Sequence, residues 1–195
     1  MINKLSVFLI KFLVDNSDTS EDIEIYHFAI FVIISNMIYS IVSIVVGLIF
    51  SCTLEMIVFL LSFKVLRHFA GGYHSKSELC CDITSMMIIC LIGLLIMLSK
   101  KYIIILRFSI AISILSFLII LCLSPIEAEA KPLSSEERKR YRIISIAIDI
   151  VIIFIIIIAY FYKLNLIYTP CCFSLLFESI LLITGKVKEV SSDAK

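Results

Sequence analysis

The sequence predicts an all-α membrane protein, a polytopic bundle of about six transmembrane helices with a short N-terminal amphipathic helix. Of its 195 residues, 61% are hydrophobic and 17% are charged, whereas a soluble domain is about 45–50% apolar and about 25% charged. The mean hydropathy is +1.11, and the charges gather in short segments between isoleucine-rich runs. We therefore expect one integral membrane domain over residues 1–195, with the lipid bilayer as a partner and no nucleic acid.

The first segment, residues 1–16, predicts a short amphipathic helix at the membrane interface. Lys4 and Lys11 interrupt a run of isoleucine, leucine and phenylalanine, as in helices that lie in the headgroup region. No small-residue cleavage site follows this run, so we do not expect a cleavable signal peptide. An unstructured N-terminal tail is the alternative.

Six apolar segments then follow that are candidates for spanning helices, which need about 20 mostly apolar residues. They are 26–50, 53–66, 82–99, 102–123, 143–162 and 164–185. The second of them is the weakest candidate, because Glu55 and Lys64 leave only 56–63 uncharged. It either spans with its charges buried or snorkelling, or it forms a re-entrant segment.

The distribution of basic residues predicts the orientation in the cell membrane. With six spans, Lys100, Lys101 and Lys163 lie on one side, and Arg107 lies within a span. Basic loops stay in the cytoplasm, so both termini and the polar loops are expected there, provided that 53–66 spans. The thirteen basic residues on that side are Lys4, Lys11, Lys64, Arg67, Lys76, Lys131, Arg138, Lys139, Arg140, Arg142, Lys186, Lys188 and Lys195.

Residues 67–82, RHFAGGYHSKSELCCD, concentrate the groups that carry chemistry. His68, His74, Cys80 and Cys81 are all zinc-ligand types, but their spacing differs from the usual pairs, and adjacent cysteines rarely reach one tetrahedral ion. We therefore expect no metal and no cofactor. A thiol or metal sensor that uses the two cysteines remains an alternative.

A cysteine nucleophile with a histidine base is the better interpretation of this stretch. A nearby imidazolium lowers the pKa of a thiol, and the histidine can later protonate the leaving amine. The two groups must approach to about 3–4 Å, whereas an unbroken helix would separate His74 from Cys81 by about 10 Å along its axis. The chain must therefore bend between them, and Gly71 and Gly72 give the turn before His74 the freedom to fold the loop back.

Cys81 is expected at or near the start of the helix that follows. There the unpaired backbone N–H groups and the helix dipole would favour a thiolate and could hold an oxyanion. Glu78 or Asp82 could orient the imidazole, although solvated surface charges are the simpler interpretation. Cys80 is a second candidate thiol, but neighbours on a helix point about 100° apart, so only one faces the histidine.

Two further groups of polar residues stand out. Residues 124–142 read as a cytoplasmic linker, in which two prolines predict a loop and 134–137, SSEE, predicts a helix start. His27, Asn36, Asp149 and Glu178 lie at membrane depth, where polar groups usually face the bundle interior. Asp149 and Glu178 either line a substrate path or form internal hydrogen bonds.

These motifs resemble the AgrB (accessory gene regulator B) family of membrane endopeptidases. The likeness rests on R-H-F-A-G-G-Y-H-S-K-S-E-L-C-C at 67–81 and on P-I-E-A-E-A-K-P-L followed by E-E-R-K-R-Y-R. It implies that 67–81 is a catalytic loop, with Cys81 as nucleophile, His74 as base, and Arg67, Gly71 and Gly72 in support.

The resemblance also implies a reaction. An AgrD-like precursor peptide would lose its acidic C-terminal tail and form a thioester with the enzyme, and an internal cysteine or serine would close a thiolactone or lactone. A homodimer is implied as well. The basic residues Lys131, Arg138, Lys139 and Arg140 would receive the tail or, equally well, only anchor the loop. The alternative function is a peptide exporter without peptidase chemistry, with Arg107, Asp149 and Glu178 in its core.

Overall fold

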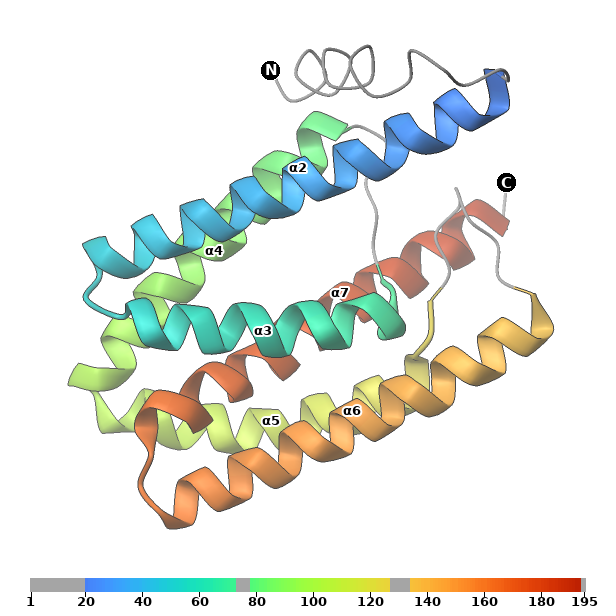
Figure 1. The fold of residues 1–195 in the computed structure, drawn as a ribbon. Helices are drawn as coiled ribbons and strands as arrows, with labels where there is room; N and C mark the ends of the chain where they lie inside the picture. The colour runs from blue at the N-terminus through green and yellow to red at the C-terminus, as the bar shows by residue number, and fades with distance from the viewer. Residues whose placement is uncertain (1–19, 73–77, 127–133, 194–195) are drawn as a thin grey trace. The chain divides into compact units, whose positions relative to one another are not determined.

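The computed structural model describes residues 20–72, 78–126 and 134–193. Within these ranges the chain forms six helices, as Figure 1 shows, and the all-α prediction is confirmed. The predicted N-terminal amphipathic helix lies outside the described residues. The helices are α2 (Ser20–Ile49), α3 (Thr53–Ala70), α4 (Glu78–Lys101), α5 (Ile103–Leu123), α6 (Ser135–Phe161) and α7 (Asn165–Asp193).

Five of the described helices are long and apolar enough to cross a membrane, which confirms a polytopic membrane protein. The candidate spans are Val32–Ile49, Asp82–Lys101, Ile104–Leu123, Ser135–Phe161 and Asn165–Val190. Helix α3 is not among them, because it carries Glu55, Lys64 and Arg67. Its 18 residues give a length of about 27 Å, close to the thickness of the hydrocarbon core. Spanning by α3, and the orientation that depends on it, stay predictions.

The chain divides into two compact units, Met1–Val42 and Ser43–Lys195, so the single domain over 1–195 also stays a prediction. In the first unit, α2 satisfies the polar group of Asn36 locally. Its amide nitrogen donates to the carbonyl of Val32 (3.0 Å), and its own carbonyl accepts from Ser40 Oγ (2.7 Å). Asn36 is exposed, so it does not need a bundle interior. The side chain of His27 lies outside the described residues.

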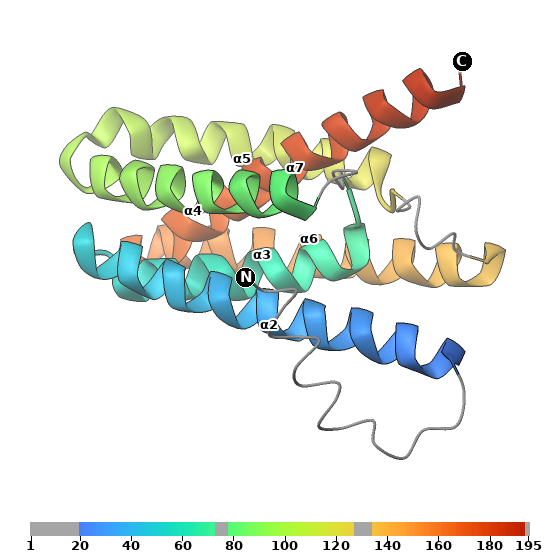
Figure 2. The same cartoon turned by 90° about the horizontal axis from the view of Figure 1, so that it is seen from above.

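Helix α7 is the centre of the second unit, in which α3 to α7 alternate in direction (Figures 1 and 2). It packs mainly on α5 and α3 and then on α6. Of its apolar span, 67% is buried, against 22–28% for the other spans. Small side chains permit this close packing: Ser179 of α7 donates to Ser116 of α5 (3.2 Å). Side chains on α7 therefore lie deepest in the unit.

The start of α3 is held by an ion pair at one end of this unit. Lys100 Nζ lies 2.6 Å from Glu55 Oε1 and donates to the carbonyl of Ser51 (2.9 Å). Glu55 is buried, so the pair accounts for one of the charges that weakened 53–66 as a span. The contact joins the end of α4 to the turn before α3.

The predicted helix start in the linker is confirmed by a reciprocal cap. The Glu137 N–H donates to Ser134 Oγ (3.2 Å), and the Ser134 N–H donates to Glu137 Oε2 (2.9 Å). This capping box satisfies two backbone donors at the helix end. Residues 135–142 of the predicted linker are therefore the first turns of α6.

Candidate active site at the end of α3

The predicted catalytic loop contains the last turn of α3, a glycine turn and the first turn of α4. Arg67 and His68 lie in α3, Gly71 and Gly72 follow it, and α4 begins at Glu78. Cys81 is thus the fourth residue of α4, at the helix start that the spacing argument requires; its side chain, like that of Cys80, lies outside the described residues. His74 also lies outside them, so the roles of both catalytic candidates stay predictions.

The two glycines occupy a backbone that other residues would strain. Gly71 has φ +72° and Gly72 has φ +122°, a region that L-residues with a Cβ rarely adopt. The space that a side chain would need is also occupied. A Cβ on Gly71 would collide with the carbonyl oxygen of Ile126, and one on Gly72 would collide with Arg67 Nη1. Both conformation and packing therefore select glycine at this turn.

The glycine turn is paired with the segment that follows α5. Gly71 and Ile126 form an isolated parallel bridge, in which the Ile126 N–H donates to the Ala70 carbonyl (3.0 Å) and the Gly72 N–H donates to the Ile126 carbonyl (3.4 Å). Ile126 is buried. The predicted catalytic loop and the predicted basic linker are therefore in contact at Gly71 and Ile126. Sequence reasoning missed this contact.

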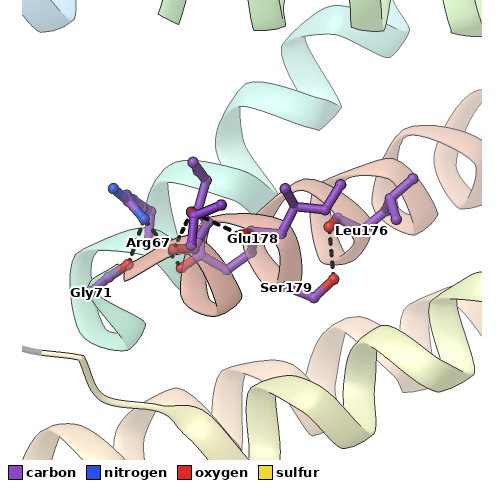
Figure 3. Close-up of polar contacts among 8 residues, drawn as sticks. Arg67, Gly71, Leu176, Glu178 and Ser179 are labelled. Carbon is purple, nitrogen blue, oxygen red and sulfur yellow. Dashed lines mark hydrogen bonds and ion pairs between the residues drawn. The ribbon is translucent and has the colours of Figure 1, made fainter. Parts of the chain in front are cut away.

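Arg67 joins the same turn to α7, as Figure 3 shows. Its Nη1 donates to the carbonyl oxygen of Gly71 (2.7 Å) and lies 3.8 Å from Glu178 Oε1. The second distance is an ion pair but too long for a hydrogen bond. Glu178 is fully buried. The predicted supporting role of Arg67 thus has a physical basis, although the role itself stays a prediction.

Two buried carboxyl groups lack a hydrogen bond within the described part of the chain. Asp149 and Glu178 are both 0% exposed, and none of their carboxylate oxygens has a hydrogen-bond partner among the described residues. The second alternative, internal hydrogen bonding, is therefore not met among the described residues. The ion pair of Glu178 with Arg67 was missed, although a lone glutamate in the apolar segment 164–185 was its signal. Arg107 is exposed on α5, so its predicted place in an exporter core is wrong.

The basic start of α6 lies beside the end of α3. The ring of Tyr141 meets Phe69 edge-on at 5.7 Å between centroids, and Phe69 meets His68 at 4.8 Å. The predicted tail-binding residues of this helix are all exposed, whereas Lys131 lies outside the described residues. Those on α6 are Arg138, Lys139 and Arg140.

Comparisons with known proteins agree on one family. The model of "Accessory gene regulator B" matches residues 3–182. The "Putative AgrB-like protein" of Clostridium perfringens (strain SM101 / Type A) is 29% identical over 120 residues, or 60% of this chain and 56% of that protein. The "Putative AgrB-like protein 2" of strain 13 / Type A is 28% identical over the same shares.

The chain thus spans about half the length of the curated relatives it matches. No solved structure matches it. The family model, however, covers nearly the whole sequence. The chain therefore belongs to the accessory gene regulator B (AgrB) family.

Proposed function

We propose that the chain is a membrane cysteine endopeptidase that removes the C-terminal tail of an AgrD-like pro-peptide in quorum sensing. Family membership supports the biological role. The observation that carries the chemistry is Cys81 in the first turn of α4, the next helix in the sequence after the glycine turn that Arg67 holds. A helix start favours a thiolate, and a fixed turn limits where His74 can reach.

The proposed reaction has two acyl transfers. His74 takes the proton of Cys81 Sγ, and the thiolate attacks the carbonyl carbon before the tail. Backbone N–H groups at the start of α4 stabilise the oxyanion, and the imidazolium gives its proton to the amine of the departing tail. His74, now neutral, takes the proton of a thiol or hydroxyl within the precursor as that group attacks the thioester. The attack expels the Cys81 thiolate and closes the ring as a thiolactone or lactone.

The tail is proposed to lie on the basic residues near this turn. Arg138, Lys139 and Arg140 are exposed beside the end of α3, and Lys131 belongs to the segment that starts at Ile126. Complementary charge would raise the association rate and fix the direction of the peptide. Positive-inside anchoring explains the same residues equally well, so this part of the proposal depends on a separate test.

Two further parts of the proposal concern assembly and orientation. As the family resemblance implies, two copies would act as a homodimer. Both termini and the catalytic loop would face the cytoplasm, where the precursor peptide is made.

The decisive experiment is the intact mass of the purified enzyme in liposomes after incubation with a candidate precursor. Wild type, Cys81→Ala and Cys80→Ala are compared. An added mass equal to the precursor without its tail, absent only from Cys81→Ala, is the expected result. If the added mass is absent only from Cys80→Ala, the protein is still a cysteine peptidase, but its nucleophile is Cys80 and not Cys81. If a verified partner precursor is neither cleaved nor attached by any of the three, the exporter alternative replaces this proposal.

A further inference from the structure

The glycine turn is clamped between α3 and α7 by a single guanidinium. Arg67 Nη1 donates to the Gly71 carbonyl at 2.7 Å and also faces Glu178 Oε1 at 3.8 Å. Gly72 lies against the same nitrogen, and a Cβ on it would approach the Leu181 carbonyl of α7 to 3.3 Å. The position of the turn therefore depends on where the guanidinium is held.

Glu178 is the group on α7 that faces this guanidinium. Its carboxylate is 0% exposed and accepts no hydrogen bond from the described residues. A buried charge without compensation is strongly unfavourable, so the carboxylate and the guanidinium hold each other in place.

We propose that Glu178 is a positioning residue that acts through Arg67 on the Gly71–Gly72 turn, and so sets the approach of His74 to Cys81. The inference rests on the proposed function, because it names a further residue for the same site. Glu178 does not touch the reacting atoms. It fixes the first residues of the loop that carries the base, and a misplacement of about 1 Å at a reacting group can lower a rate by about 10²-fold.

The test uses a measurement that needs no precursor. Thiolate is the form that iodoacetamide alkylates, so the pH dependence of alkylation at Cys81, resolved by mass spectrometry of its peptide, reports the contact with His74. Cys80 in the same peptide is the internal reference. Glu178→Gln is compared with Asp149→Asn, a matched change of an equally buried carboxyl that has no ion pair with Arg67 among the described residues.

We expect Glu178→Gln to shift the Cys81 alkylation midpoint to higher pH and to slow acyl-enzyme formation by about 10²-fold. Asp149→Asn should leave the Cys81 alkylation midpoint and the rate of acyl-enzyme formation unchanged. The Cys80 alkylation profile should be unchanged in either variant. Glu178→Asp should recover part of the loss. Because Glu178→Gln removes the negative charge that faces Arg67 on α7 and so risks misfolding, Arg67→Gln/Glu178→Gln is measured too. This double variant should form the acyl-enzyme no more slowly than Arg67→Gln alone, because the two residues act as a unit.

The outcomes separate this inference from the proposed function. A Glu178→Gln enzyme that is alkylated and acylated like wild type overturns the positioning role and leaves the peptidase intact. Equal losses in Glu178→Gln and Asp149→Asn also overturn it, because they indicate a general need for buried carboxyls. A shifted alkylation profile in an enzyme that never processes a verified precursor supports the positioning role and refutes the peptidase function.

Discussion

Gly72→Ala is the substitution whose effect can be worked out most directly from the structure. Two independent features forbid a side chain at this position. The φ of +122° is unfavourable for any residue with a Cβ, and the added methyl group would collide with Arg67 Nη1. The guanidinium must then move, and its hydrogen bond to the Gly71 carbonyl (2.7 Å) is lost or distorted.

The magnitudes of these two effects are comparable. A non-glycine residue in a sparsely populated backbone region costs about 1–3 kcal/mol. Loss of a hydrogen bond to a charged group costs about 1.5–3 kcal/mol. Together they predict that Gly72→Ala lowers the free energy of unfolding by about 2.5–6 kcal/mol. In an Arg67→Ala background the collision with Nη1 disappears, and the Leu181 carbonyl stays at 3.3 Å from the added Cβ. The same substitution should then cost mainly the backbone part, about 1–3 kcal/mol.

The assay is reversible unfolding of the purified protein in detergent with a denaturant titration. Wild type, Gly72→Ala, Arg67→Ala and the double variant form a thermodynamic cycle. Gly185→Ala is the matched control, because Gly185 lies inside α7 and alanine is favoured over glycine in helices. A cost below about 1 kcal/mol for Gly72→Ala would refute the strain argument. An equal cost with and without Arg67 would refute the clamp.

Two other predictions test the linker side of the site. Ser134→Ala removes one half of the capping box and should lower the free energy of unfolding by about 1 kcal/mol, whereas Ser134→Asp should retain most of it; a loss of equal size in both variants would contradict the cap. Charge reversal of Arg138, Lys139 and Arg140 to glutamate should raise KM for an acidic-tailed precursor at least tenfold, an effect that added salt should reduce. A neutral-tailed precursor is the control for that measurement, and an equal rise in KM for both peptides would favour anchoring over tail binding.

The amino-acid sequence determined the helices and the local turn. In a bilayer every backbone group must find a partner within its own segment, so long apolar runs between charged segments leave little choice but helices. The glycine turn and the start of α6 are also local, because they depend on φ and on a cap within four residues, 134–137. Even the weakest candidate span, 53–66, was recognisable as an exception from its charged residues Glu55 and Lys64.

Only the tertiary structure decided which residues meet. Arg67 pairs with Glu178, Gly71 with Ile126, and α7 rather than another apolar helix forms the centre of the unit. The same limit explains the error over Arg107, which lies on the exposed face of α5. In a soluble protein a polar stripe marks the outer face of each helix, but helices that are apolar on all sides lack this signal. Lipid-facing and buried positions then look alike in sequence, and packing alone distinguishes them.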